Sequence, residues 1–304
     1  MKIEEYNLKQ LVAPLLEWYK GHARILPWRE FPTPYRVWVS EIMLQQTRVE
    51  AVKPYFERFV EALPDIKSLA ECPEEKLLKL WEGLGYYNRV RNMQTAAKQV
   101  MENYEGMLPE EYGELLKLKG IGHYTAGAVS SIAYGKQAAA VDGNVLRVIS
   151  RGAADERDIM KQSVRSNMEG ELLKILPHDQ PGVFNQALME LGATVCLPNG
   201  EPKCGACPWA SFCLARAEDK ISWIPVKSKG KERRMEERTV LLIRDGEKIL
   251  LRRRPEKGLL AGMYEFPNMD GFLDEKDALE RVKSMGLSPL RIEVLESSKH
   301  IFSH

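Results

Sequence analysis

The stretch Leu115-Leu-Lys-Leu-Lys-Gly120-Ile-Gly122-His-Tyr-Thr125-Ala126 decides the fold that we expect for this chain. It places Gly-x-Gly between two helical stretches, and the second is predicted to run from Ala126 to Tyr134. Two glycines let the backbone turn tightly, and the N–H groups that start the following helix then point outward, where a phosphate oxygen is favoured. The stretch therefore predicts a hairpin between two helices that holds the DNA backbone without reading its sequence. An ordinary turn between helices is the alternative.

The first two thirds of the chain share this helical texture. Apolar residues recur at helical spacing from Leu8 to Tyr19, which predicts an amphipathic helix that stops at Gly21. After Cys213 the texture changes, and the basic stretch from Lys227 to Arg234 is typical of an exposed linker. The last part predicts a β-hairpin, because the apolar runs Thr239–Ile243 and Lys248–Leu251 flank Asp245-Gly246. We therefore expect a helical region followed by a smaller domain that contains β-strands.

Composition limits the classes of protein that this chain can belong to. It has 304 residues, of which 44% are hydrophobic, and its 44 basic residues nearly balance its 43 acidic ones. A polyanion must therefore be bound by local basic patches and not by net charge. The chain contains no charge-free apolar run of roughly 18–20 residues, and its first residues have no apolar signal core. We expect a cytoplasmic protein without a membrane partner, in which cysteines stay reduced.

Four cysteines form the tightest cluster of potential metal ligands, Cys196-x7-Cys204-x2-Cys207-x5-Cys213. Four thiolates suit either zinc or an iron–sulfur cluster, and the spacing alone does not decide between them. One short loop supplies every ligand, which favours a cubane iron–sulfur cluster. The fifth cysteine, Cys72, is interpreted as an ordinary small residue.

Two carboxylates are candidates for acid–base chemistry. Glu41 lies on a predicted helix between Tyr35 and Gln46 with largely apolar neighbours, where desolvation would raise its pKa and let it act as a general acid. The alternative places this glutamate at the edge of the apolar stripe, in water. Asp142 opens Asp-Gly-Asn-Val-Leu-Arg-Val-Ile and is interpreted either as a helix N-cap or as a carboxylate that points toward the gripped nucleotide. Spacing does not choose between these readings.

Taken together, these segments resemble the adenine DNA glycosylase family, the MutY type of the helix-hairpin-helix glycosylase superfamily. The resemblance covers roughly residues 6–216 and rests on several ordered motifs. These are Leu26-Pro-Trp-Arg29, Trp38-Val-Ser-Glu-Ile-Met-Leu-Gln-Gln-Thr47, Trp81-Glu-Gly-Leu-Gly-Tyr-Tyr87, Leu118-Lys-Gly-Ile-Gly-His-Tyr-Thr-Ala-Gly127, Val141-Asp-Gly-Asn-Val-Leu-Arg147 and Phe184-Asn-Gln-Ala-Leu-Met-Glu-Leu-Gly192.

The resemblance implies a mainly α catalytic region over residues 1–220, a linker over 221–236 and a smaller α+β Nudix-like domain over 237–304. Within the first region, a six-helix barrel is expected over about residues 26–134, and an iron–sulfur cluster domain over about 1–25 and 135–220. The glutamate pair that binds magnesium in Nudix enzymes is replaced by Lys283-Ser284, so pyrophosphate hydrolysis is not expected. The family's domain continues past the equivalent of residue 304, so we expect an incomplete domain. If this is the natural product, 8-oxoguanine discrimination should be weakened while adenine excision survives; if it is a fragment, the missing piece explains the gap.

The resemblance also implies roles for individual residues. Glu41 would protonate the purine and handle the attacking water, while Asp142 would stay ionised and stabilise the oxocarbenium-like sugar. Asn144 would hold that aspartate, and Tyr124 would line the same pocket. The remaining implied residues are Arg24, Leu26, Trp28 and Gln186 around the flipped adenine; Gln46 and Tyr86 as side chains that enter the duplex; Gly120, Gly122 and Thr125 at the DNA backbone; Phe302, Ser303 and His304 at 8-oxoguanine; and the four clustered cysteines around one [4Fe–4S] cluster.

The expected function is that of a monofunctional glycosylase of base excision repair, a nucleoid-associated monomer that removes adenine mispaired with 8-oxoguanine or guanine in double-stranded DNA. Bifunctional relatives carry a nucleophilic lysine just before the hairpin threonine, and here that position is Tyr124. No strand cleavage at the abasic site is therefore expected. Two alternatives remain, a related glycosylase for thymine mismatches and a non-catalytic DNA-binding iron–sulfur protein.

Overall fold

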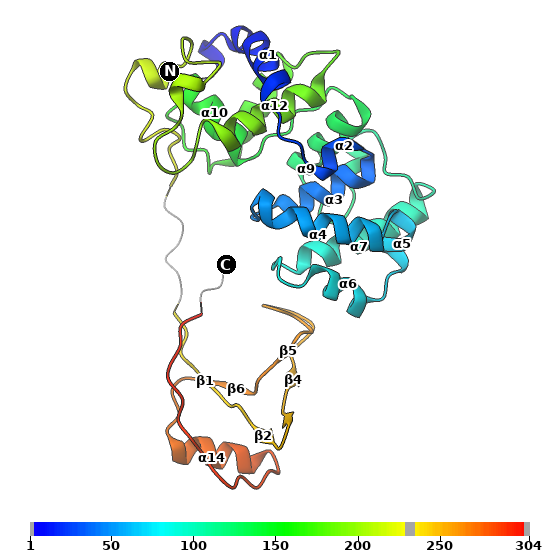
Figure 1. Cartoon of the computed structure of the whole chain (residues 1–304), viewed down its shortest axis with the longest axis vertical. Helices are drawn as coiled ribbons and strands as arrows, with labels where there is room; N and C mark the ends of the chain where they lie inside the picture. The colour runs from blue at the N-terminus through cyan, green and yellow to red at the C-terminus, as the bar shows by residue number, and fades with distance from the viewer. Residues whose placement is uncertain (1–2, 229–234, 301–304) are drawn as a thin grey trace. The chain divides into compact units, whose positions relative to one another are not determined.

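The computed structural model describes residues 3–228 and 235–300, and the chain divides into two compact units, residues 1–229 and 230–304. Figure 1 shows helices throughout the described part of the first unit, and short strands with a helix in the second. Among the described residues, none of the helices is long and apolar enough to cross a membrane.

Most helices of the first unit have two to four turns. The α-helices are α1 (Val12–His22), α2 (Pro27–Glu30), α3 (Pro34–Leu44), α4 (Val49–Ala62), α5 (Ile66–Glu71), α6 (Glu74–Trp81), α7 (Asn88–Asn103), α8 (Tyr112–Leu115), α9 (His123–Ala128), α10 (Gly143–Gly152), α11 (Gln162–Leu173), α12 (Pro181–Thr194) and α13 (Leu214–Ala217). Short 3-10 turns form at η1 (Ile3–Glu5), η2 (Leu8–Leu11) and η4 (Cys204–Ala206), and a π-helical turn forms at η3 (Val129–Ala133).

Two hydrophobic cores organise this unit. The first is built by the segment between Leu26 and Val129 and contains the fully buried rings of Trp38, Phe56 and Trp81. The second combines the N-terminal segment Ile3–Tyr19 with residues from the segment 139–209. In Figure 1, α1 accordingly lies beside α12, far along the chain, and α12 packs against α10, while α3, α4, α5 and α7 group together. The chain thus leaves its second core after α1, builds the first and returns.

The two cores meet where α12 packs against η3. The buried Asn185 of α12 accepts a hydrogen bond from Ala140 N (3.1 Å) and donates to Ser131 Oγ and Ala138 O, each at 2.8 Å. Gly182 lets the backbones approach closely, because a Cβ there would lie 2.5 Å from Ser131 O. This joint connects η3, which packs against α3 and α9 in the first core, to α12, which packs against α10 in the second.

The hairpin differs from its sequence prediction in one respect. Its second helix, α9, begins at His123 and not at Ala126, because Gly122 already serves as the N-cap in an extended conformation. The helix then continues as η3 (Val129–Ala133), and Tyr134 is its last helical residue, as predicted. Helix α1 continues through Gly21 to His22, so the predicted glycine stop is wrong by one residue.

The second unit has three separate antiparallel strand pairs and helix α14 (Glu275–Ser284). The pairs are β1 (Arg238–Val240) with β6 (Asn268–Asp270), β2 (Arg244–Asp245) with β3 (Lys248–Ile249), and β4 (Arg252–Arg253) with β5 (Tyr264–Glu265). The predicted hairpin is confirmed, with Asp245 opposite Lys248 and Gly246 in the left-handed region at φ 59°. The run Thr239–Ile243 does not form one strand, because β1 ends at Val240 and pairs with β6.

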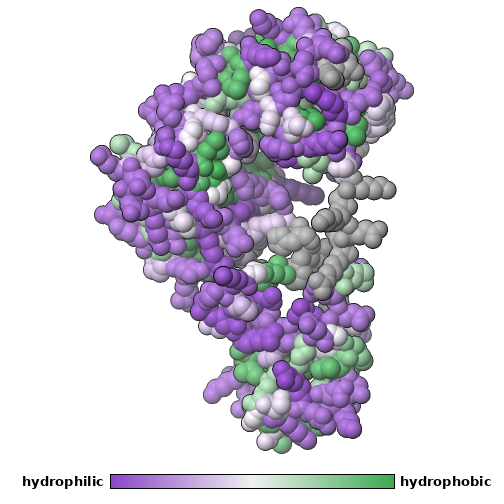
Figure 2. Space-filling model, turned by 180° about the vertical axis from the view of Figure 1, so that it is seen from behind, coloured by the Kyte–Doolittle hydropathy of each residue, from purple (hydrophilic) through white to green (hydrophobic). Residues whose placement is uncertain are grey.

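Apolar side chains remain at the surface of this unit, as the green patches in its part of Figure 2 show. Strands of two or three residues in isolated pairs bury little area on their faces. The exposed set includes Val240, Leu242, Ile249, Leu251, Phe272, Val294 and Leu295.

Candidate active site

Glu41 is buried on α3, with only 5% of its surface exposed. The helix starts at the Pro34 N1 position after Thr33, whose side chain accepts from Arg36 N. The carboxylate of Glu41 accepts a short hydrogen bond from the Tyr124 hydroxyl, which comes from α9 just after the glycine hairpin. Tyr124 also lies 3.7 Å from Met189 Sδ on α12. The alternative of a glutamate reaching water is excluded, and the hairpin delivers a hydrogen-bond donor to the buried acid.

Burial raises the pKa of Glu41 to about 7. The hydrogen bond from Tyr124 opposes this rise, the negative charge of Asp142 adds to it, and the positive charge of Arg29 opposes it. Tyr124 is half-buried, and desolvation of its hydroxyl together with the negative charge of Glu41 raises its pKa well above the usual range, so the hydroxyl keeps its proton and donates. A carboxyl group whose pKa lies near 7 holds and releases a proton at neutral pH, as a general acid must.

Asp142 is the N-cap of α10, and its Oδ1 accepts from Val145 N at 2.8 Å. Its other oxygen, Oδ2, accepts from Asn144 Nδ2 at 2.7 Å, and Asn144 is oriented in turn by Arg147, whose Nη2 donates to its Oδ1 at 2.8 Å. Burial raises the pKa of Asp142, while these hydrogen bonds oppose the rise. The N-cap reading is therefore correct, and the charge of Asp142 also acts on Glu41 from the second core. The structure brings both carboxylates into one electrostatic environment.

A buried ion-pair cluster adjoins this site and was missed by sequence reasoning. Glu190 of α12 is fully buried, and its carboxylate accepts from Arg24 Nε (2.5 Å), Arg24 Nη2 (3.1 Å) and Arg29 Nη2 (2.8 Å). Burial by itself raises the pKa of Glu190, but the bonds and charges of Arg24 and Arg29 outweigh it and lower the pKa below its usual value. The available signal was a lone glutamate on the apolar helix Ala187–Leu191. Because Arg29 also acts on Glu41, this cluster belongs to the site.

The residues assigned to the adenine pocket lie in two different surroundings. Arg24 is held by Glu190, and Gln186 lies half-buried one helical turn before that glutamate on α12. Leu26 and Trp28 are buried in the first core, where the Trp28 ring packs edge-on against Phe56 at 5.4 Å. Core packing thus accounts for Leu26 and Trp28 in this structure, and their contact with a flipped base stays a prediction.

The glycine hairpin presents backbone N–H groups at its surface. Gly120 has φ 78°, and a Cβ at this position would lie 2.7 Å from Asn92 Cβ, so both conformation and space require glycine. The first intrahelical bond of α9 runs from Ala126 N to Gly122 O, and the N–H groups before it have no partner within the helix. Thr125 is buried, so neither its hydroxyl nor its backbone faces solvent in this structure, and its contact with DNA stays a prediction.

The two side chains predicted to enter the duplex sit on loops with left-handed residues. Gln46 follows α3, is exposed and has φ 59°, and Tyr86 follows α6, is half-buried and has φ 49°. Left-handed conformations are unfavourable for residues other than glycine and persist only where surrounding contacts enforce them.

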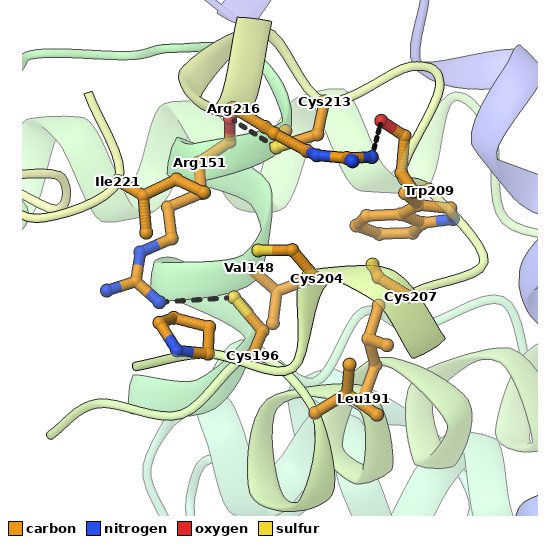
Figure 3. Close-up of a pocket in the computed structure, with 14 residues that line it drawn as sticks. Val148, Arg151, Leu191, Cys196, Cys204, Cys207, Trp209, Cys213, Arg216 and Ile221 are labelled. Carbon is orange, nitrogen blue, oxygen red and sulfur yellow. Dashed lines mark hydrogen bonds between the residues drawn. The ribbon is translucent and has the colours of Figure 1, made fainter. Parts of the chain in front are cut away.

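The four clustered cysteines line one apolar pocket between α10, α12 and the loop that leads to α13 (Figure 3). Arg151 Nη1 lies 3.3 Å from Cys196 Sγ, and Cys213 Sγ lies 3.4 Å from Arg151 O. Burial raises the pKa of the Cys207 thiol to about 11 and also raises that of Cys213, so positive charge is needed to keep them as thiolates. Four thiols around one pocket beside an arginine fit a four-thiolate iron–sulfur group. Cys72 is buried in the first core.

Within residues 3–228 and 235–300, no three His, Cys, Asp or Glu side chains are close enough to bind a single metal ion. Phe302, Ser303 and His304, assigned to 8-oxoguanine, lie outside the described residues.

The sequence matches two known families. Residues 39–173 match the family described as HhH-GPD superfamily base excision DNA repair protein, and residues 239–304 match the NUDIX domain. The chain is 34% identical over 292 residues to the adenine DNA glycosylase of Buchnera aphidicola subsp. Baizongia pistaciae (strain Bp), covering 95% of this chain and 82% of that protein. It is 35% identical to the human adenine DNA glycosylase, covering 95% of this chain and 64% of that one.

Solved structures give the same fold. A thermostable thymine-DNA glycosylase matches with a TM-score of 0.62 and 28% identity, covering 69% of this chain and 96% of that one. A non-covalent endonuclease III–DNA complex matches with a TM-score of 0.59 and 26% identity, covering 70% and 98%. The predicted fold class, a helical helix-hairpin-helix region followed by a smaller Nudix-like region with short strands, is confirmed.

Proposed function

The chain belongs to the adenine DNA glycosylase family, and on that premise we propose that Glu41 and Asp142 hydrolyse the N-glycosidic bond of adenine mispaired with 8-oxoguanine or guanine in double-stranded DNA. The observation that carries this proposal is the buried Glu41 with a pKa of about 7, bonded to Tyr124 and within the field of Asp142.

The bond between the sugar carbon C1′ and the purine breaks with its electron pair leaving on the base. Glu41 donates its proton to a ring nitrogen of the adenine, so the base leaves neutral, and the positive charge develops on the sugar. The Asp142 carboxylate, fixed by Asn144 and the start of α10, stabilises that charge. Water then adds at C1′ and gives its proton to the Glu41 carboxylate, which restores the acid.

Bifunctional relatives cleave the DNA strand after base removal, and they use a lysine as the nucleophile. This chain has a tyrosine at the corresponding position. Tyr124 stands just before Thr125, and its hydroxyl is bonded to Glu41. A phenol carries no amine nitrogen, so it does not form an imine with the sugar. Borohydride in the presence of substrate DNA should therefore trap no protein–DNA adduct, and efficient trapping with strand nicking would contradict this assignment.

The four clustered cysteines are proposed to hold one [4Fe–4S] cluster. When bound, the cluster cross-links the loop from Cys196 to Cys213 and fixes its shape, as four metal–thiolate bonds stabilise a short segment. Equal amounts of iron and sulfide with a broad visible absorbance are expected, and stoichiometric zinc would contradict the proposal.

Recognition of the opposite base is proposed for the second unit, through Phe302, Ser303 and His304, with the protein acting as a monomer. Alanine at His304 should reduce the ratio of adenine excision opposite 8-oxoguanine to that opposite guanine. An unchanged ratio would remove this residue from the recognition site.

Single-turnover cleavage of three duplexes tests the main proposal. They carry adenine opposite 8-oxoguanine, adenine opposite guanine, and thymine opposite guanine. Adenine release from the first two and no thymine release from the third is expected. Thymine release would favour the thymine-mismatch alternative, for which a solved structure of the same fold exists, and no base release would favour a DNA-binding protein without this activity.

A further inference from the structure

Arg89, the second residue of α7, donates hydrogen bonds to several backbone carbonyls outside its own helix. Its Nη1 donates to Ile42 O (2.8 Å), Met43 O (3.0 Å) and Gln45 O (2.6 Å). Its Nη2 donates to Leu84 O (3.0 Å), Gly85 O (3.3 Å) and Thr47 Oγ1 (3.4 Å). One guanidinium therefore connects two loops that are separated by about 40 residues in sequence.

The first loop is the end of α3 and the turn that follows it. The last carbonyls of a helix lack the usual N–H partner four residues later, so Met43 O can accept from Arg89, and Ile42 O accepts from Arg89 in addition to Gln45 N at 3.4 Å. Glu41 lies immediately before these carbonyls, and the left-handed Gln46 lies immediately after Gln45. The guanidinium thus fixes the point at which the helix that carries the acid passes into the loop that carries Gln46.

The second loop follows α6 and carries Tyr86. Arg89 bonds the two carbonyls before this residue, and its guanidinium carbon lies 5.5 Å from the centre of the Tyr86 ring and 5.2 Å from that of Trp81. A planar guanidinium is suited to this site, because it donates in several directions within its plane while its faces stack on aromatic rings. Lysine offers a single ammonium in its place.

Arg89 is half-buried, with its guanidinium placed between the two loops and the rings of Tyr86 and Trp81. Burial lowers the pKa of Arg89 to about 10, a value at which the group is still charged at neutral pH. This partly desolvated cation bonds six acceptors in two loops, and each loop contains a left-handed residue other than glycine. Such strained conformations persist at functional sites, so we interpret the bonds of Arg89 as fixing the two loops for a function and not only as adding stability.

We propose that Arg89 is a positioning residue that holds the Gln46 and Tyr86 loops in the conformation needed to enter the duplex, and so controls extrusion of the adenine and not cleavage of its bond. This inference rests on the proposed function. Without Arg89, both loops relax toward ordinary backbone conformations, and each extrusion event must first restore the left-handed residues.

The test compares extrusion-dependent with extrusion-independent excision. Arg89→Met keeps the apolar stem and removes the donors, and Arg89→Lys keeps the charge with fewer donors. Arg91→Met is the matched control, because Arg91 lies on the same helix and makes an ion pair with Glu74 at 2.8 Å. Each protein is given adenine opposite guanine in a complete duplex, and adenine opposite an abasic-site analogue, where the target base is already poorly paired and stacked.

Arg89→Met should excise adenine from the complete duplex at least about tenfold more slowly in single turnover, with little or no loss on the abasic-opposed duplex. A fluorescent 2-aminopurine beside the target should report correspondingly slower unstacking, and the pH at which the rate falls should not move. Arg89→Lys should show a smaller loss of the same kind, which keeps the test valid if Arg89→Met does not fold, and Arg91→Met should behave as wild type.

Equal losses on both duplexes would assign Arg89 a merely structural role, and no loss on either would show that the loops keep their shape without it. Both results would overturn this proposal. If the wild-type protein released no adenine from either duplex, that result would contradict the proposed function itself and not the role of Arg89.

Discussion

The substitution Glu41→Gln should remove activity and at the same time stabilise the protein at alkaline pH. Burial raises the pKa of Glu41 from 4.5 to about 7. Between these two pH values, the folded protein keeps a proton that the unfolded protein releases, so the free energy of unfolding of the wild type falls as the pH rises through this interval. Glutamine is neutral at every pH and keeps an oxygen that accepts the hydrogen bond from the Tyr124 hydroxyl. The free energy of unfolding of the variant should therefore not fall with pH in this interval.

The magnitude follows from the two pKa values. A difference of one pKa unit corresponds to 1.36 kcal/mol. The stability advantage of Glu41→Gln should therefore grow from about 1 kcal/mol at pH 5 to about 3 kcal/mol at pH 8. The single-turnover rate of adenine release should fall by at least about a hundredfold, because the proton donor is lost. The wild-type rate should itself decline above pH 7 as Glu41 ionises.

Urea denaturation followed by circular dichroism at pH 5 and pH 8 measures the first effect, and release of free adenine measures the second. The exposed Glu102→Gln on α7 is the matched control and should change neither quantity. A stability difference that does not grow with pH would refute the raised pKa. Retained activity in Glu41→Gln would refute the role of this residue as the acid.

Two further substitutions test the surroundings of the site. Glu190→Gln leaves the two arginines it binds without their counter-charge; breaking this buried pairing should lower the free energy of unfolding by about 3–5 kcal/mol. It should also move the decline of the rate to lower pH, since more positive charge then favours ionised Glu41; an unmoved profile would separate the cluster from the acid. Gly192→Ala places a Cβ 2.6 Å from that of Asn144. This overpacking should lower the free energy of unfolding by about 1–3 kcal/mol and slow adenine release. Gly170→Ala, whose Cβ would have nothing within 4 Å, should have neither effect. Equal behaviour of the two alanine variants would show that the site tolerates the displacement.

Local signals explain what could be predicted from the sequence. The Asp-Gly turn between β2 and β3 and the glycine hairpin before α9 each depend on a few neighbouring residues, and both were expected. The burial of Glu41 was one of two interpretations that its apolar neighbours allowed. Helix ends were less accurate, because Gly21 is tolerated inside the last turn of α1 and Gly122 caps α9 earlier than the apolar pattern indicates.

Contacts between distant segments could not be predicted in this way. Glu190 meets Arg24 across 166 residues, and no local spacing encodes that pair. Arg89 begins a polar helix and would be interpreted as a solvated cation, since its acceptors are backbone carbonyls without a residue signature. The pairing of β1 with β6 is non-local in the same sense, and nothing in the run Thr239–Ile243 itself indicates this partner.

The central claim is that Asp142 and Glu41 together break the adenine glycosidic bond, and release of free adenine under single-turnover conditions tests it most directly. With adenine opposite 8-oxoguanine, the wild type should release adenine and leave an intact strand with an abasic site. Asp142→Asn keeps a side-chain oxygen for the α10 cap but removes the charge, and it should bind the same duplex while releasing adenine at least about a hundredfold more slowly. Adenine release by Asp142→Asn at the wild-type rate, or none by the wild type, would contradict the account.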